Sequence, residues 1–145
     1  MPLPPTYLFI AIVVMVLLHL LLPGAKIIAY PWRLVGFVPL LLGFLINLIA
    51  DQAFKKNHTT VKPFEESTSL ITTGVFRLSR HPMYLGMVLM VGGIALLLGT
   101  LTPFLVIPVF ALLMEMMFVR IEERMLASKF GDAWWQYQKN VRRWI

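Results

Sequence analysis

The chain has 145 residues, of which 59% are hydrophobic and only 14% are charged, and it carries a formal net charge of +6. A soluble domain is about 45–50% apolar and about 25% charged, so this composition excludes an ordinary soluble protein and indicates one small integral membrane domain. The absence of cysteine excludes disulfides, thiolate nucleophiles and zinc fingers, and the basic residues, which stand beside apolar runs, suit lipid headgroups better than nucleic acid.

Four apolar runs follow one another along the chain, at residues 5–22, 31–50, 83–98 and 103–119. Eighteen helical residues reach roughly 27 Å, which is just enough for the hydrocarbon core of a bilayer. We therefore predict an all-α integral membrane protein with about four transmembrane helices in a single domain, 1–145. The last two runs are joined by a short turn and form an antiparallel hairpin.

Several polar or small residues inside these runs need an explanation. Asn47 and Asp51 lie four residues apart on one helix face, where they either pair with backbone and headgroup water or line a polar cavity. Gly92 and Gly99 share a face and predict the close approach of a neighbouring backbone. His19 is expected to pack between helices or to form an interhelical hydrogen bond rather than to bind a metal.

The polar parts of the chain are a long connection, residues 51–80, and a tail, residues 120–145. A connection of this length is usually functional or disordered, and its spaced apolar residues favour a folded, functional segment. The tail is expected to continue the fourth span as an amphipathic helix, to stop near Gly131, and then to lie in the membrane interface. Its aromatic residues are Trp134, Trp135, Tyr137 and Trp144.

Four spans place both termini, the connection and the tail on the same side of the membrane. That side carries most of the 13 lysines and arginines, namely Lys55, Lys56, Lys62, Arg77, Arg80, Arg120, Arg124, Lys129, Lys139, Arg142 and Arg143. The positive-inside rule therefore predicts a multi-pass protein with this side in the cytosol.

The connection ends in the segment Arg80-His81-Pro82-Met83-Tyr84, where polar sequence meets the third apolar run. A proline fits the first turn of a helix, so Pro82 predicts a helix start with Arg80 and His81 at headgroup level. The pair Glu122-Glu123 at the end of the fourth span lies on the same side. A purely structural alternative is that Arg80 pairs with one of these glutamates and ties the helix ends together.

Two motifs extend around these residues. The first is Thr72-Thr73-Gly74-Val75-Phe76-Arg77 with Ser79-Arg80-His81-Pro82-Met83-Tyr84-Leu85-Gly86. The second is Glu122-Glu123-x-x-Leu126-x-x-x-Phe130-Gly131-x-x-Trp134-x-x-Tyr137, and the chain then ends in Val141-Arg142-Arg143-Trp144-Ile145. Together they resemble the signature of the isoprenylcysteine carboxyl methyltransferase family, and related membrane phospholipid methyltransferases share the pattern. The resemblance covers roughly residues 59–145.

The resemblance implies methyl transfer from S-adenosylmethionine to a membrane-dissolved lipid or prenylated acceptor, with prenylcysteine-type O-methylation of a carboxylate as the leading reading. It also implies a set of cofactor-binding residues: Thr68, Ser69, Leu70, Ile71, Phe76, His81, Pro82, Met83, Tyr84, Glu122 and Glu123. Phe76 stands where a tyrosine is common in the family, and Arg142 stands where a proline is usual.

Arg80 and Glu115 are the residues that we expect to act on the acceptor. A carboxylate acceptor is already nucleophilic and needs only orientation, which a bidentate Arg80 could provide. An amine acceptor needs a base, for which Glu115 or Glu122 is the choice. Glu115 and Glu122 are seven residues apart and share one face of a regular α-helix. The chain has no Gly-x-Gly-x-Gly stretch after a strand, so a doubly wound fold is excluded as the cofactor binder.

Two other functions are compatible with the sequence. The first is a small four-helix proton-coupled transporter with Glu115 as its proton site. Such proteins tend to have short loops on both sides, whereas this chain concentrates its polar residues in one connection and one tail. The second is a membrane reductase that uses a nicotinamide cofactor on a similar scaffold. Prenylcysteine, phospholipid amine and small isoprenoid carboxylate all remain possible acceptors, and the oligomeric state is not specified.

Overall fold

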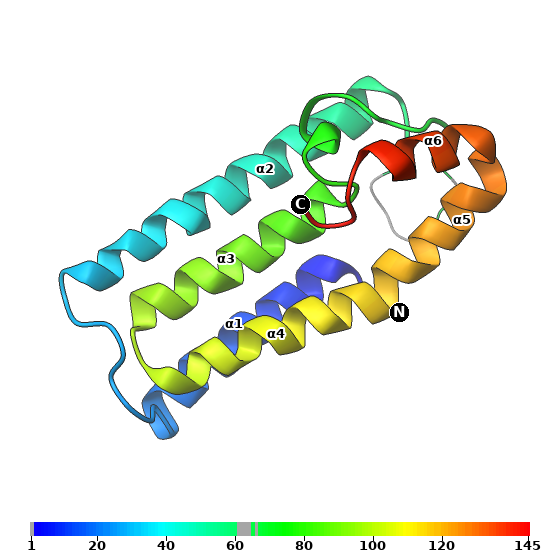
Figure 1. Ribbon diagram of the computed structural model, residues 1–145. Helices are drawn as coiled ribbons and strands as arrows, with labels where there is room; N and C mark the ends of the chain where they lie inside the picture. The colour runs from blue at the N-terminus through cyan, green and yellow to red at the C-terminus, as the bar shows by residue number, and fades with distance from the viewer. Residues whose placement is uncertain (1, 61–64, 66) are drawn as a thin grey trace.

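The computed structural model describes residues 2–60, 65 and 67–145, and these residues form helices and connections with no strand among them (Figure 1). The α-helices are α1 (Pro4–Leu21), α2 (Phe37–Lys56), α3 (Pro82–Leu98), α4 (Leu101–Met114), α5 (Arg120–Phe130) and α6 (Asp132–Asn140). Two short 3₁₀ turns, η1 (Trp32–Gly36) and η2 (Gly74–Arg77), and a π-helical segment, η3 (Glu115–Val119), complete the set.

Among the described residues, three helical segments are long and apolar enough to cross a membrane: Pro4–Leu21, Trp32–Lys56 and Leu101–Phe130. The fourth apolar helix, α3, has 17 residues and therefore spans about 26 Å. The helices form a bundle in which α3 packs against α2 and α4, while α1 packs against α3 and α4. The prediction of an all-α integral membrane protein is confirmed.

The second helix is shifted along the chain relative to the sequence-based expectation. It begins with the 3₁₀ turn η1, and α2 runs to Lys56 rather than ending at residue 50. An ion pair of 2.7 Å between Lys55 and Asp51, one helical turn apart, stabilises this extension. Phe54 packs its ring edge-on against Phe76 at 5.4 Å. The first part of the expected 51–80 connection is therefore helical, and residues 61–64 and 66 of it lie outside the described part of the chain.

Glycine residues bring η1, α2 and α3 into close contact, but Gly92 is not among them. A side-chain carbon placed on Gly92 would meet nothing within 4 Å, so the predicted contact there is wrong. A side-chain carbon on Gly93 would lie 2.6 Å from the carbonyl oxygen of Gly36 and 2.7 Å from the backbone nitrogen of Leu40. The predicted close approach does occur at Gly99, where a side-chain carbon would lie 2.6 Å from the Ile28 carbonyl oxygen. Gly99 also ends α3 with a φ of 73°, in the left-handed region that favours glycine.

A second contact of this kind lies two turns away, where Gly43 of α2 meets Gly86 of α3. A side-chain carbon on Gly43 would collide with the carbonyl oxygen of Gly86. Asn47 lies over Gly86 as well, and its side-chain amide donates to the Gly43 carbonyl at 2.9 Å. Asn47 therefore pairs with backbone rather than with a cavity, and small residues provide the close approach that stabilises membrane helix pairs.

The turns opposite the polar connection are held together by hydrogen bonds. Segment 23–28 lies against the α3–α4 turn, with backbone bonds from Ile27 to the Gly99 carbonyl at 2.9 Å and from Leu101 to the Ala25 carbonyl at 3.0 Å. His19 Nδ1 lies 2.8 Å from Thr100 Oγ1. His19 therefore forms the interhelical bond that its position in the first apolar run indicates.

The last apolar helix continues past the fourth span as the sequence predicts. Segments α4, η3 and α5 follow one another without a break, and α5 ends at Phe130, before Gly131 with a φ of 54°. Beyond Gly131 the chain folds back as α6, over residues 67–81 of the connection (Figure 1). Trp134 is only 2% exposed and Tyr137 only 6%, so both are packing residues and not the interfacial anchors that we expected.

The two neighbouring glycines of α3 allow a matched test of the helix contact. We expect Gly93→Ala to destabilise the protein by about 1–3 kcal/mol, because the added methyl group overlaps with backbone atoms that cannot move alone. Gly92→Ala should be neutral or slightly stabilising, since alanine is the better helix former. Thermal unfolding in the same detergent measures both, and equal melting temperatures for the two variants would contradict the assigned contact.

Candidate active site

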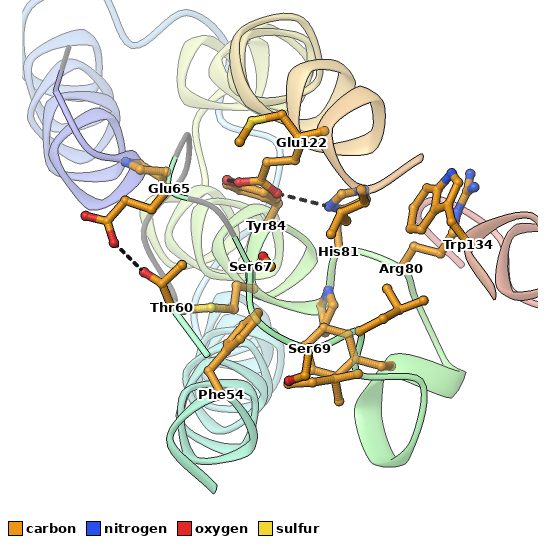
Figure 2. Close-up of a pocket in the computed structure, with 18 of the residues that line it drawn as sticks. Phe54, Thr60, Glu65, Ser67, Ser69, Arg80, His81, Tyr84, Glu122 and Trp134 are labelled. Carbon is orange, nitrogen blue, oxygen red and sulfur yellow. Dashed lines mark hydrogen bonds and ion pairs between the residues drawn. The ribbon is translucent and has the colours of Figure 1, made fainter. Parts of the chain in front are cut away.

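A cavity of about 200 Å³ lies at the end of the bundle where α5, α6 and the connection meet (Figure 2). Its walls come from the start of α1, the end of α2, the connection, the start of α3, and helices α5 and α6. The lining residues are Leu3, Pro4, Pro5, Phe54, Thr60, Glu65, Ser67, Ser69, Leu70, Ile71, Phe76, Arg80, His81, Pro82, Met83, Tyr84, Met87, Glu122, Met125, Leu126, Lys129, Trp134 and Tyr137.

Most of the residues expected to bind a cofactor line this cavity. They are Ser69, Leu70, Ile71, Phe76, His81, Pro82, Met83, Tyr84 and Glu122, and Arg80 joins them. Thr68 is not among the lining residues, and its hydroxyl donates to the His58 carbonyl at 2.8 Å. Glu123 and Glu115 are also absent from the lining, so the structure places them behind the cavity wall.

His81 lies between two carboxylates of α5. Its Nε2 is 3.1 Å from Glu123 Oε1 and its Nδ1 is 3.6 Å from Glu122 Oε2. The Tyr84 hydroxyl donates to Glu122 Oε1, which holds that carboxylate at the cavity wall. Burial alone would lower the pKa of His81, but the hydrogen bonds and negative charges of Glu122 and Glu123 outweigh it, so the net pKa is raised. The imidazole therefore takes up a proton more readily than it does in water.

The Arg80 guanidinium is buried but only partly paired. Its side chain is 7% exposed, and Nη2 lies 3.3 Å from Glu123 Oε1. The guanidinium carbon sits 5.6 Å from the centre of a Trp134 ring, in a cation–π contact. Within the described part of the chain, Nε and Nη1 of Arg80 have no hydrogen-bond partner. Burial lowers the pKa of Arg80, and the attraction of Glu123 opposes this shift. Unpaired buried donors are costly, so the site favours an anionic or carbonyl oxygen here.

The local sequence explains how this end of the connection is held. Gly74 starts the turn η2 with a φ of 63°, and the Tyr137 hydroxyl donates to the Phe76 carbonyl at 2.6 Å. The buried Ser79 hydroxyl accepts a bond from the His81 backbone at 3.1 Å. Helix α3 then begins at Pro82, as the sequence predicts. Arg80 and His81 are thus fixed between a tyrosine-anchored turn and a helix start.

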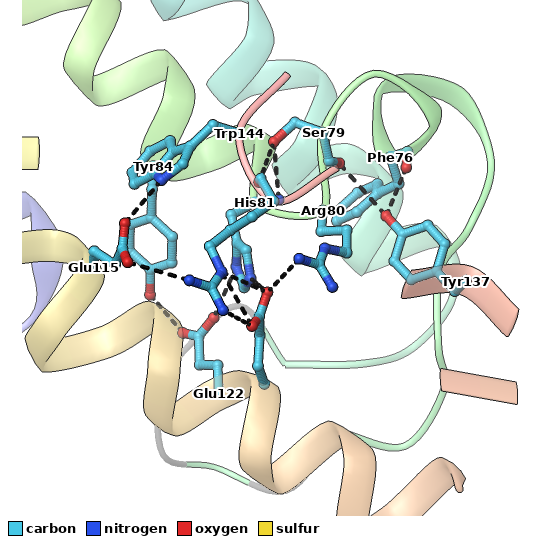
Figure 3. Close-up of polar contacts among 11 residues, drawn as sticks. Phe76, Ser79, Arg80, His81, Tyr84, Glu115, Glu122, Tyr137 and Trp144 are labelled. Carbon is cyan, nitrogen blue, oxygen red and sulfur yellow. Dashed lines mark hydrogen bonds and ion pairs between the residues drawn. The ribbon is translucent and has the colours of Figure 1, made fainter. Parts of the chain in front are cut away.

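Glu115 lies on the far side of this cluster, among residues of the tail (Figure 3). Its Oε1 accepts from Arg143 Nη1 at 3.1 Å and from Arg120 Nη2 at 3.3 Å, and its Oε2 accepts from the Trp144 indole at 3.1 Å. The expected shared face of Glu115 and Glu122 assumed a regular α-helix. The structure instead bridges Glu115 to Glu123 through Arg143, because a π turn intervenes.

Some residues that contribute to the site are not evident from the sequence pattern. The pattern gives Arg143 only as one basic residue of the tail and of the terminal motif, although an arginine beyond a paired-glutamate helix end is itself a signal for an ion pair. Leu3, Pro4 and Pro5 also line the cavity. Nothing in their sequence indicates this position, since it depends on how α1 packs against α3 and α4.

The fold and the site together define a helical membrane protein with a charged cavity at one end of its bundle. Residues 32–133 match the model of the phospholipid methyltransferase family, and the chain belongs to this family. The resemblance to the membrane methyltransferases found in the sequence is thereby confirmed.

Two relatives carry matching segments. The chain is 33% identical over 95 residues to the protein-S-isoprenylcysteine O-methyltransferase of Schizosaccharomyces pombe, a match that covers 63% of this chain and 38% of that protein. It is 36% identical over 63 residues to an uncharacterized protein of Haemophilus influenzae, covering 43% of this chain and all of that protein. The chain thus spans well under half the length of the yeast enzyme. No solved structure matches the chain at a significant level.

The raised pKa of His81 predicts a pH-dependent stability. Since the folded pKa lies above the unfolded value of about 6.5, folding takes up a proton. The stabilisation is therefore fully present below pH 6.5 and is lost as the pH rises through the folded pKa. We expect the melting temperature to fall over this window in the wild type and to vary less in His81→Gln.

The exposed His58 provides the control for this measurement. Its φ of 52° suits asparagine, so His58→Asn should preserve the backbone and retain the wild-type pH dependence. A His81→Gln protein whose melting temperature follows the wild-type curve across the whole window would show that His81 is not the titrating group.

Proposed function

We propose that this protein is a methyltransferase that transfers a methyl group from S-adenosylmethionine to an acceptor dissolved in the membrane, in a single membrane domain. The acceptor that the site suits best is a carboxylate on a lipid or prenylated molecule, as in prenylcysteine O-methylation. The observation that carries the proposal is the buried Arg80, which has two guanidinium nitrogens without a hydrogen-bond partner in the described part of the chain and lines the same cavity as His81, Tyr84 and Glu122 in a member of a methyltransferase family.

The residues of the cavity fit the proposed cofactor. Glu122 supplies a carboxylate whose two oxygens are oriented by Tyr84 and His81, and its negative charge attracts a positively charged ligand. Ser69 and Leu70 of the connection also line the cavity, and Phe76 adds an aromatic side chain. When bound, S-adenosylmethionine provides an activated methyl group on a sulfonium ion.

The acceptor side of the cavity is apolar. Leu3, Pro4 and Pro5 at the start of α1 and Met87 of α3 contribute apolar side chains to the wall, and Met87 belongs to the cluster that α1 packs into. A lipid-like chain entering from the bilayer would bury its apolar surface there, which is favourable by about 25 cal/mol per Å². Entry from the membrane also keeps water away from the reacting groups. These walls support a lipid or prenylated acceptor, and membrane lipids are the surrounding partners.

Arg80 favours a carboxylate over an amine as the reacting group. A guanidinium presents its donors in a planar fork that matches two carboxylate oxygens. An amine acceptor would need a base, and of the two glutamates considered, Glu122 lines the cavity while Glu115 is engaged by Arg143, Arg120 and Trp144. The same engagement gives no support to Glu115 as the proton site of a transporter. The cytosolic orientation proposed from the charge distribution would place the cavity where S-adenosylmethionine is available.

Binding of the cofactor product tests the proposal directly. We expect S-adenosylhomocysteine to bind the purified protein with a dissociation constant near micromolar, and Glu122→Gln or His81→Gln to weaken binding about tenfold or more, equivalent to about 1.4 kcal/mol. Asp51→Asn is the matched control, because that carboxylate pairs with Lys55 and does not line the cavity. Titration calorimetry that shows no heat with either S-adenosylmethionine or S-adenosylhomocysteine, together with no thermal stabilisation, would refute the proposal.

The role of Arg80 can be separated from cofactor binding. Arg80→Lys keeps the charge and loses the fork, so we expect methyl transfer to N-acetyl-S-farnesylcysteine to fall about tenfold or more while S-adenosylhomocysteine affinity changes by less than about threefold. Labelled S-adenosylmethionine reports the transfer, and release of labelled methanol in base identifies a methyl ester. A variant that loses cofactor affinity instead would assign Arg80 to the cofactor, and a base-stable label would indicate an amine acceptor.

A further inference from the structure

Residues 141–145 lie against the ionic cluster (Figure 3), and they do not line the cavity. The connection holds their backbone through two hydrogen bonds. The Arg80 N–H donates to the Arg142 carbonyl at 3.1 Å, and the buried Ser79 hydroxyl donates to the Arg143 carbonyl at 3.0 Å. We call residues 141–145 the C-terminal strap. Its backbone position is therefore set by the two residues that precede His81.

The side chain of Arg143 connects two carboxylates of the long helix. Its Nε lies 3.2 and 3.1 Å from the two oxygens of Glu123, and its Nη2 lies 2.7 Å from Glu123 Oε2. Its Nη1 lies 3.1 Å from Glu115 Oε1. One guanidinium thus uses its fork on Glu123 and its remaining arm on Glu115. A side chain with this geometry fixes the direction of both carboxylates more closely than a point charge would.

The π segment η3 explains why one arginine can reach both glutamates. The Arg120 N–H bonds to the Glu115 carbonyl, an i to i+5 bond that takes one residue more than an α-helical turn. Glu115 and Glu123 are eight residues apart, and the additional residue brings them onto a common face. Glu122 then points about 100° away around the helix, toward the cavity. The bridge across η3 therefore also sets the direction of Glu122.

We propose that Arg143 is a positioning residue for the cavity: by clamping Glu115 and Glu123 across the π turn, it holds Glu122 in the cavity wall and His81 between its two carboxylates. Arg143 itself does not line the cavity, so it acts through α5 and not on a ligand. This inference rests on the proposed function only where its test measures the binding of S-adenosylhomocysteine. The charge state of His81 can be measured without any ligand.

The electrostatics give Arg143 a second, measurable effect. His81 faces Glu122 and Glu123 from α5 and Tyr84 from α3, and the charged groups next in line are Arg80 of the connection and Arg143 of the strap, which both contact Glu123. Removing Arg143 leaves more of the negative potential of Glu123 on His81. The imidazole should then titrate at a higher pH than in the wild type. A residue that ties the chain end to the bundle only through its backbone carbonyl would not change this titration.

The neighbouring arginine is the matched control. Arg142 has an exposed side chain, and only its backbone carbonyl contacts the connection. The experiment compares Arg143→Ala, Arg143→Lys and Arg142→Ala in the full chain. Histidine-ring NMR, with His81→Gln to assign the signal, follows the titration of His81, and calorimetry measures the affinity for S-adenosylhomocysteine. We expect Arg143→Ala to raise the His81 midpoint and to weaken binding about tenfold, and Arg142→Ala to change neither.

Each result has a defined meaning. Wild-type affinity and a wild-type His81 midpoint in Arg143→Ala would overturn the inference. If Arg143→Ala does not fold, Arg143→Lys decides, because one ammonium cannot hold both carboxylates and should still weaken binding; unchanged affinity in this variant would overturn the inference too. A raised His81 midpoint in Arg143→Ala, with no binding of S-adenosylhomocysteine by the wild type, would refute the proposed function while supporting the positioning role.

Discussion

The pairing of buried charges at one end of the bundle is the constraint on which the rest of the structure depends. A charge removed from water is costly unless it is paired and hydrogen-bonded. Glu123 is only 8% exposed and meets this requirement through His81, Arg80 and Arg143, which come from two distant parts of the chain, the end of the connection and the strap. Each partner can be in place only if the connection, α3, α5 and the strap are all correctly packed. The cluster therefore makes the polar end of the protein a single cooperative unit.

The remainder of the bundle follows a different rule, since lipid offers no hydrophobic gain between helices. Between η1, α2 and α3, backbones approach closely at Gly36, Gly43, Gly86 and Gly93. Between α1, α3 and α4, large side chains such as Met15 and Phe110 pack in a buried cluster. Helix α2 consequently leaves most of its large apolar side chains on the outer surface, as a lipid-facing helix requires. Charge pairing therefore stabilises the cavity end of the membrane domain, whereas close backbone contact stabilises the packing of η1 and α2 against α3.

The sequence predicted the features that depend on composition and on local chemistry. The long apolar runs, the helix start at Pro82 and the helix end at Gly131 all follow from such patterns, as does most of the cavity wall between Ser69 and Tyr84. It could not predict the register of packed helices. Gly86 and Gly93 have the same spacing as Gly92 and Gly99, so spacing alone could not select the contact that forms.

The position of Glu115 also could not be predicted from the sequence, since residues seven apart share a helix face only where no π turn such as η3 intervenes. For the same reason, the sequence does not show which of Glu122 and Glu123 faces the cavity. Trp134 shows a related limit: tryptophan near a membrane end is commonly interfacial. Here Trp134 is buried because α6 folds back over the connection, where the Trp134 ring packs against the Arg80 guanidinium.

Helix α1 has a consequence of its own for how this family can diversify. The family match begins at residue 32, so Leu3, Pro4 and Pro5 reach the cavity from a helix outside the matched region. The ionic cluster, by contrast, draws no residue from α1. One wall of the cavity is therefore uncoupled from the charges that hold the opposite wall. Under the proposed function, substitutions in α1 reshape the acceptor wall while the charge pairing stays intact, so new acceptors are accessible to evolution without rebuilding the catalytic end.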